Sequence, residues 1–475
     1  MHYKNQKYLL VILAFFTISF GYAQIEVKNK ILDFETMLPL ENASIYVLNT
    51  TIGTVSNADG KFALVVPQEF ENDTLVVSSI GFKTYKVPVN EFDNTLEIYL
   101  EDEVASLDEI ILVAENRPKT GNEIVLKAIE ELSENLPDSS YIQKGFLRHK
   151  ERNSIEFKWL IESAITVYDS GYASNANTHL KVNVDQVRKS YDLRDVDSLF
   201  AYVSYKNQNT RRKRLKVTDV RRNDLTTRQL VKAIKWNDTR VNGLHNLFQG
   251  KLNLLRNSKS PKALFGDNIL ATHQFKLDTI LVDNGRKLYK IKINKSREFV
   301  GLGTKGIFNE GFEADGWLYI YYDNYAFKKI EYNLVAASKA QKIRSKRLFN
   351  TQLNHKLIIT YMEYKNKMYP SYIYYETPKL VNVGLRSGVN VSDAEKERYN
   401  KEERYYYTVQ ELLFSEIILD KDQIKTTLQS PWDMDIFSPK PYNKAFWKNY
   451  NVLLESEEDE ELIEDLTQRA SLFKD

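Results

Sequence analysis

The chain has 475 residues, of which 43% are hydrophobic and 27% are charged, and its formal net charge is +2. This length predicts two or three domains, and the near-neutral charge gives no general attraction to nucleic acid. The lack of cysteine excludes disulfides, thiol nucleophiles and cysteine-ligated metal sites. With 30 tyrosines and 23 phenylalanines, the composition favours a mainly β or α+β fold, because aromatic side chains suit half-buried strands.

Residues 1–23 read as a secretory signal peptide. Lys4 and Lys7 precede an apolar run from Tyr8 to Phe20, and small residues occupy positions 21 and 23. The run is shorter than the roughly 20 apolar residues that span a bilayer. We therefore expect cleavage before Gln24, export, and no transmembrane helix in the mature chain.

Residues 24–101 alternate short strands with turn signals, as in a small β-sandwich. The expected strands are Ala43–Leu48, Lys61–Val66, Leu75–Ser78 and Leu96–Leu100. Asp59-Gly60 supplies a turn that needs a positive φ angle.

The order and spacing of several landmarks here resemble the carboxypeptidase-D regulatory-like domain. They are Pro39-Leu40, Ala43–Val47, Gly53-Thr54, Asp59–Phe62 and Ser79–Phe82. The resemblance implies a prealbumin-like sandwich that is an accessory domain without catalytic residues. Similar domains stand at the front of TonB-dependent transporters and of uncharacterised envelope proteins. The resemblance thus implies a periplasmic or outer-membrane-associated location in a Gram-negative type of envelope.

Residues 102–140 are expected to form a linker and an amphipathic helix. Leu107–Val113 is predicted to be a short extended segment. Thr120 and Glu123 have the spacing of a capping box, and apolar residues follow from Ile124 at helical intervals until Pro137. We expect the apolar stripe of this helix to pack into a core.

Residues 141–452 are predicted to be a larger β-rich α+β domain. Three pairs of alternating segments, around Gly285, Asn324 and Asn366, read as hairpins and therefore as an antiparallel meander with one buried face. The segments Tyr141–Arg148, Gly316–Lys329 and Phe446–Asn451 are similar to the region that follows the regulatory-like domain in a family of uncharacterised envelope proteins. The sheet is also similar to the half-barrel of periplasmic lipoprotein carriers.

Three further segments have helix or strand signals. A charged helical stretch is expected over 211–240, and Ser392 and Glu395 have capping-box spacing for a charged helix that ends near Arg404. Tyr405–Val409 is predicted to be a strand. Residues 453–475 form an acidic C-terminal helix or tail, either docked or solvated.

Two motifs suggest binding of phosphate groups, and each has a simpler explanation. Gly301, Gly303 and Gly306 match a dinucleotide motif, but the required helix does not follow, so a flexible loop is favoured. A basic cluster suits anionic lipid headgroups or a solvated helix face, and we favour the latter. Its members are Arg211, Arg212, Lys213, Arg214, Lys216, Arg221 and Arg222.

The sequence offers no convincing catalytic site. No histidine has a glutamate three residues later, so the zinc-ligand pair of carboxypeptidases is missing. His149 and Glu151 are expected to be structural, and Asp433 and Asp435 are a pair of carboxylates only in sequence. We predict no catalytic, cofactor-binding or metal-binding residues.

These observations favour a non-catalytic, exported cell-envelope protein. Its expected partner is a lipid, a glycan or another envelope protein at the outer membrane, and not nucleic acid. The alternatives are a hydrolase that uses carboxylates gathered by the fold, and an accessory subunit of an outer-membrane transport system.

Overall fold

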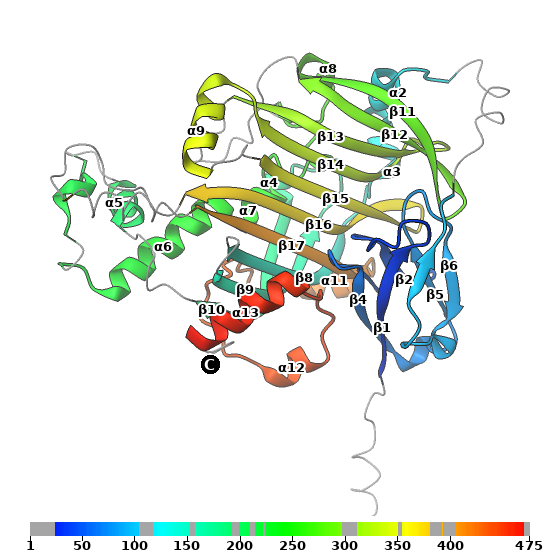
Figure 1. The fold of residues 1–475 in the computed structure, drawn as a ribbon, viewed down its shortest axis with the longest axis horizontal. Coiled ribbons are helices and arrows are strands. Elements are labelled where there is room, and N and C mark those ends of the chain that lie inside the picture. The colour runs from blue at the N-terminus through cyan, green and yellow to red at the C-terminus, as the bar shows by residue number, and fades with distance from the viewer. Residues whose placement is uncertain are drawn as a thin grey trace, which may run out of the picture.

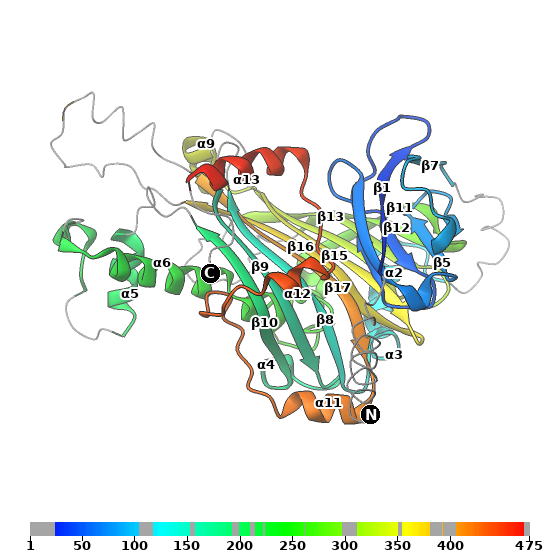
Figure 2. The same ribbon diagram turned by 90° about the horizontal axis from the view of Figure 1, so that it is seen from below.

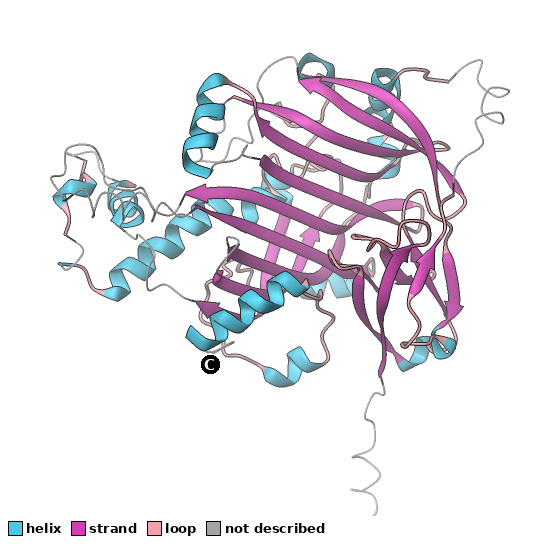
Figure 3. Ribbon diagram, viewed as in Figure 1, coloured by secondary structure: helices cyan, strands magenta, loops and turns pink. Residues whose placement is uncertain are grey.

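The computed structural model describes residues 24–103, 117–152, 157–191, 199–209, 214–221, 224–261, 263–296, 311–349, 354–380, 392 and 405–469. A small sandwich lies against one face of a large twisted sheet, and helices cover the other face (Figure 1). Figure 2 shows the same two parts from below, with the large sheet strongly twisted, as is usual for antiparallel strands. The fold is mainly β, as predicted (Figure 3).

The sandwich consists of a three-stranded and a four-stranded sheet, in the orders β4-β1-β7 and β3-β2-β5-β6. Its strands are β1 (Gln24–Asp33), β2 (Ser44–Val47), β3 (Gly53–Val55), β4 (Lys61–Pro67), β5 (Thr74–Ser78), β6 (Tyr85–Pro88) and β7 (Ile98–Leu100). In β4, buried Phe62, Leu64 and Val66 alternate with half-buried residues, because successive side chains of a strand point to opposite faces. The predicted turn at Gly60 has φ +73°.

The large sheet has ten antiparallel strands in the order β10-β9-β8-β17-β16-β15-β14-β13-β12-β11. Their bounds are β8 (Tyr141–Arg152), β9 (Phe157–Asp169), β10 (Leu180–Tyr191), β11 (His273–Asp283), β12 (Arg286–Ser296), β13 (Phe312–Tyr321), β14 (Phe327–Ala336), β15 (Asn354–Tyr364), β16 (Lys367–Leu380) and β17 (Tyr405–Ile418). The three predicted hairpins are β11–β12, β13–β14 and β15–β16. Strand β17 pairs with β8, which precedes it by more than 250 residues.

The helices are α2 (Gly121–Glu130), α3 (Leu132–Asn135), α4 (Ala176–His179), α5 (Leu199–Asn207), α6 (Thr227–Asn242), α7 (Leu244–Phe248), α8 (Ile269–Thr272), α9 (Lys339–Phe349), α11 (Lys421–Leu428), α12 (Lys444–Lys448) and α13 (Glu457–Arg469). Thr120 caps α2 in a capping box with Glu123, as predicted. The apolar stripe of α2 is buried in the main core, which also contains Leu230 of α6 and Leu247 of α7. We call this helix-covered side of the sheet the inner face.

The other side, the outer face, contacts the sandwich and the C-terminal part of the chain. Helix α13 is docked: Leu466 is fully buried against Phe157 and Leu160 of β9. Of the two forms predicted for the acidic tail, the described part of the chain adopts the docked one. The predicted signal peptide, the extended segment 107–113 and most of the predicted helix 392–404 lie outside the described residues.

Candidate functional site

A cleft of about 510 Å³ separates the sandwich from one end of the large sheet. We call it the domain cleft. One wall is the β2–β3 hairpin of the sandwich, residues 44–55, and the other is formed by residues near the tips of the three sheet hairpins. Ligand sites occur preferentially at such domain interfaces.

Tight turns bring these hairpin tips to the same end of the sheet. Asn284 and Gly285 have φ angles of +49° and +78°, and Lys365 and Asn366 have +48° and +61°. Consecutive positive φ values are typical of the two-residue turns whose twist matches that of antiparallel strands. Gly285 suits this conformation because it has no Cβ atom.

Three contacts hold the sandwich across the cleft. The Thr51 hydroxyl donates to the carbonyl of Ser415 in β17 at 3.1 Å. The Gly81 amide donates to the carbonyl of Val282 in β11 at 2.8 Å. Between them, the Asn284 side-chain amide lies 3.4 Å from the Tyr46 hydroxyl. The sandwich therefore spans the ends of strands β11 to β17, and the cleft lies beneath it.

The first charged group of the cleft is centred on buried Asp283. Its carboxylate accepts a hydrogen bond from the Tyr321 hydroxyl at 3.0 Å and lies 3.4 Å from the Lys328 ammonium. Burial by itself lowers the pKa of Lys328, but the nearby Asp283 carboxylate, together with Tyr321 and Tyr46, raises it above its usual value. Lys328 therefore carries a positive charge that the Asp283 carboxylate balances, and it is not available as a base.

The second charged group is centred on Arg286. Its guanidinium binds both Asp323 oxygens, at 2.8 and 3.0 Å, and the Glu363 carboxylate at 2.6 Å. It also lies 3.7 Å above the ring of Tyr321. The two cations Lys328 and Arg286 face three carboxylates, and Lys365, which also lines the cleft, adds a third positive charge. The positive and negative charges at the cleft are therefore equal in number.

Neutral polar groups complete the lining of the cleft. They come from Tyr46, Asn49, Thr50, Asn284, Tyr364 and Ser371. Burial raises the pKa of Tyr46 above its usual value, so its hydroxyl stays protonated. The cleft therefore offers donors, acceptors and aromatic faces without unbalanced charge.

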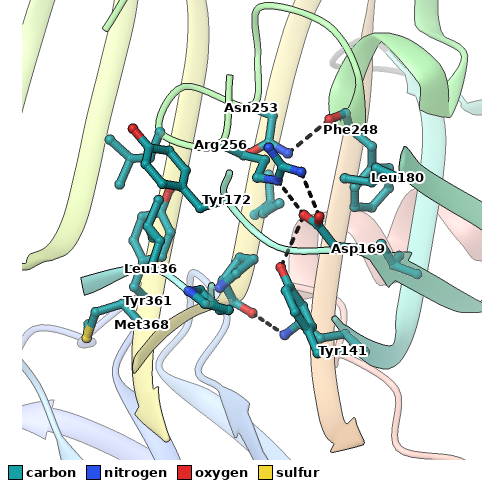
Figure 4. A pocket seen from close by; sticks show the side chains of 16 residues that line it. Leu136, Tyr141, Asp169, Tyr172, Leu180, Phe248, Asn253, Arg256, Tyr361 and Met368 are labelled. Carbon is teal, nitrogen blue, oxygen red and sulfur yellow. Dashed lines mark hydrogen bonds and ion pairs between the residues drawn. The ribbon is translucent and has the colours of Figure 1, made fainter. Parts of the chain in front are cut away.

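A second pocket lies on the inner face, between the sheet and the helices (Figure 4). Its polar centre is a buried ion pair: Arg256 binds the two Asp169 oxygens at 2.6 and 2.7 Å, with the Tyr141 hydroxyl 3.5 Å away. Leu136, Leu180, Phe248 and other apolar side chains surround it. Its volume is about 40 Å³, which is enough for a few water molecules.

The segment 443–469, which we call the C-terminal strap, joins the sandwich to the outer face. The Asn451 side chain accepts from the Val65 amide at 2.7 Å and donates to the Val65 carbonyl at 3.1 Å, at the edge of β4. Trp447 packs edge-on against Phe146 of β8 and beneath the guanidinium of Arg188. The strap thus fixes the sandwich relative to the sheet.

Buried charges reinforce this attachment. The Lys150 ammonium lies 2.5 Å from Asp459, 3.2 Å from Glu455 and 3.2 Å from Glu411. Burial raises the pKa of Glu455, whereas Lys150 and its neighbours lower that of Asp459 despite its burial. All four side chains already have partners of opposite charge, which is typical of buried structural ion networks.

The residues singled out in the sequence do not gather at either pocket. His149 is fully buried on the inner face, 3.1 Å from the Asp238 carboxylate of α6. Asp433 and Asp435 accept backbone hydrogen bonds two residues onward and so shape turns. Arg214, Lys216 and Arg221 are exposed. The motif 301–306 and the rest of the basic cluster lie outside the described residues.

Sequence reasoning missed the domain cleft itself. The turn residues Asn284 and Gly285 were predicted, but the sequence does not tell which hairpin tips the sandwich covers. Within the described ranges, no group of three or more His, Asp or Glu side chains has a geometry that suits a metal ion. No described helix is long and apolar enough to cross a membrane.

Comparisons with known proteins identify the first domain. Residues 27–112 match the family model of the CarboxypepD_reg-like domain. The TonB-dependent receptor SusC of Bacteroides thetaiotaomicron is 32% identical over 136 residues, which cover 27% of this chain and 13% of the receptor. A LolA superfamily protein of Nitrosomonas europaea aligns over 65% of this chain and 97% of its own, at 10% identity and a TM-score of 0.20.

The match fits the observed sandwich of β1 to β7, and a CarboxypepD_reg-like domain is a regulatory module without catalytic residues. The chain spans about an eighth of the length of the curated receptor that it matches. Residues 27–112 of the chain are therefore a carboxypeptidase-D regulatory-like domain.

Proposed function

We propose that this chain is a non-catalytic binding protein of the cell envelope, exported to the periplasm or the outer membrane, and that it holds its ligand in the domain cleft. The cleft carries this proposal: it has the size of a ligand site, about 510 Å³, and lies between two domains. N-terminal sequencing of the mature protein tests export, because cleavage is expected before Gln24.

An uncharged, hydroxyl-rich ligand, such as a glycan, suits the cleft best. Asp283 is paired with Lys328, and Arg286 with Glu363, so a charged ligand would compete with existing ion pairs. The hydroxyls, amides and tyrosine rings remain to bind neutral hydroxyl groups and sugar faces. A lipid is less suited, because the apolar inner-face pocket has a volume of only about 40 Å³.

Isothermal titration calorimetry with a panel of neutral oligosaccharides tests this assignment, with uronic-acid oligosaccharides of matched length as the charged comparison. Asn49→Ala removes an amide from the cleft wall and leaves the contact between Asn284 and Tyr46 in place. We expect it to weaken binding about fivefold, since one hydrogen bond contributes about 1 kcal/mol. Asn366→Ala is the matched control, because Asn366 has a similar positive φ angle but does not line the cleft.

Two outcomes would contradict the assignment. One is binding of the charged oligosaccharides alone. The other is equal loss of affinity in the Asn49 and Asn366 variants, which would indicate an effect of turn strain and not of the cleft.

A hydrolase is not favoured by the cleft. Its two lining carboxylates, Asp283 and Glu363, are both held by cations, whereas glycoside hydrolysis needs one carboxyl group as an acid and another as a base or nucleophile. Analysis of the oligosaccharides after incubation with the protein provides the check, because release of products would support an enzyme.

A second candidate function is that of an accessory subunit of an outer-membrane transport system. The partial similarity to the TonB-dependent receptor supports it. The test is chemical crosslinking in intact cells, followed by identification of the attached proteins. Recovery of an outer-membrane transporter that depends on the sandwich would favour this role.

A further inference from the structure

Exposed apolar side chains concentrate on the sandwich. Among the described residues, the large hydrophobic side chains that face solvent are Phe34, Met37, Leu38, Tyr85, Leu96, Tyr99 and Ile343. All but Ile343 belong to the sandwich. Phe34, Met37 and Leu38, which are 56%, 62% and 63% exposed, lie in one loop after β1, and we call them the sandwich patch. Clusters of this kind often mark protein contacts.

Hydrogen bonds hold this loop in one conformation. The Asp33 carboxylate accepts from the amides of Glu35 at 2.8 Å and Thr36 at 3.2 Å. The Met37 amide donates to the Asp33 carbonyl, and the Asp33 amide donates to the Leu38 carbonyl, both at 2.9 Å. Met37 has φ +58°, which is unfavourable for a residue with a long side chain. The loop therefore presents its apolar side chains in a fixed, preorganised arrangement.

The surroundings of the sandwich patch are acidic. The segments 33–38 and 97–102 contain Asp33, Glu35, Glu97, Glu101 and Asp102 and no basic residue. They are neighbours, because the Phe34 amide donates to the Leu100 carbonyl. Lys83 neutralises Glu101. An anionic membrane surface would repel this rim, whereas a basic surface would be attracted to it.

Helix α9 has the complementary character. Ile343 is 58% exposed, and Lys339 and Lys346, four residues before and three after it, lie on the same side of the helix. Both lysines are exposed, whereas Gln341 and Ser345 are buried on the opposite side. The helix contains no acidic residue. We call Lys339, Ile343 and Lys346 the α9 face.

We propose that the sandwich patch of one copy of this chain docks on the α9 face of a second copy. Apolar side chains would meet Ile343, and the acidic rim would meet the two lysines. The contact forms between copies, because α9 lies at the end of the large sheet that is away from the sandwich (Figure 1). Since two different surfaces meet, the contact is heterologous and leaves one free surface at each end of a dimer. This inference is independent of the ligand proposed for the domain cleft.

Sedimentation velocity of the mature protein tests the proposal. We expect the average mass to rise with concentration, and to rise less at 0.5 M salt, because salt screens exposed charges. A patch variant, Phe34→Ser with Leu38→Ser, and a helix variant, Lys339→Glu with Lys346→Glu, should each remain monomeric. Tyr85→Ser is the matched control, since it removes an exposed aromatic side chain elsewhere on the sandwich and should associate like the original protein.

Mixing the two variants is the decisive measurement. The patch variant keeps an intact α9 face and the helix variant keeps an intact sandwich patch, so an equimolar mixture should form dimers but no longer assemblies. A protein that stays monomeric at every concentration would overturn the proposal. Unchanged association of either variant, or a mixture that stays monomeric although both variants melt like the original protein, would also overturn it.

Discussion

Replacing Lys150 with methionine tests whether the buried charges of the C-terminal strap are a structural network. The change removes the ammonium that lies within 3.2 Å of Asp459, Glu455 and Glu411 and keeps a side chain of similar length. Removing one partner of a buried ion pair typically costs 3–5 kcal/mol, because it leaves uncompensated charge. We expect about 3 kcal/mol, since Arg148 and Arg152 still face the same carboxylates.

Lys61→Met is the matched control. Lys61 also binds the strap, at Glu457, but both side chains are largely exposed, and exposed pairs contribute about 0–1 kcal/mol. Urea unfolding followed by tryptophan fluorescence measures both variants, because Trp447 lies in the strap. If the two substitutions lowered the free energy of unfolding equally, burial would not be the reason why the Lys150 network stabilises the protein.

The pH dependence of the stability provides a second test of the Lys150→Met variant. Burial raises the pKa of Glu455, so this carboxyl group takes up a proton more readily than an exposed one. In Lys150→Met, the carboxylates lose the ammonium that neutralised them, and protonation of these carboxylates removes their repulsion. The difference in stability from the original protein should therefore shrink as the pH falls from 7 to 5. A difference that stays constant over this range would argue against uncompensated charge as its cause.

Three further predictions concern the large domain. Asp169→Asn should lower the free energy of unfolding by about 3 kcal/mol, because it leaves buried Arg256 without its carboxylate. The control is Asp433→Asn, on an exposed turn, which should change the free energy of unfolding little; urea unfolding measures both variants. Gly316→Ala should destabilise the protein strongly, since its Cβ atom would lie 1.9 Å from the Glu331 carbonyl oxygen. In Gly285→Ala the added Cβ atom meets no atom within 4 Å, so this variant should lose only about 1 kcal/mol of stability through backbone strain. Burial lowers the pKa of His355 to about 4, so below pH 6.5 the unfolded chain binds a proton at this residue that the folded chain does not. His355 should therefore lower the stability by about 1.4 kcal/mol per pH unit down to pH 4. His355→Gln should reduce the slope by this amount in urea titrations at pH 7, 6 and 5, whereas His273, whose pKa burial also lowers to about 4, keeps its own contribution.

Local signals predicted most of the secondary structure. The capping box at Thr120 and the turn at Gly285 each depend on residues that are close in sequence, so their physical causes can be read directly. The resemblance carried by the landmarks between Pro39 and Phe82 correctly predicted the first domain.

The candidate site was not predictable in the same way. The domain cleft depends on where the sandwich docks, and this docking rests on contacts such as Asn451 with Val65, which are 386 residues apart. The ion network around Lys150 likewise joins residues about 300 apart. No periodicity or motif in the sequence predicts such long-range contacts, because each partner alone looks like an ordinary polar residue of a strand or turn.

The pairing of β17 with β8 has a consequence for how the sheet is completed. Until residues 405–418 are available, β8–β10 and β11–β16 can form only two separate sheets, each with an unpaired edge at β8 or β16. Unpaired edges invite association with other chains, and pairing over such a sequence distance is slow to form. A chain interrupted before β17 would therefore expose two open edges in the middle of its core. Of the ten strands of the large sheet, β17 comes last in the chain, and it is the strand that makes the sheet continuous.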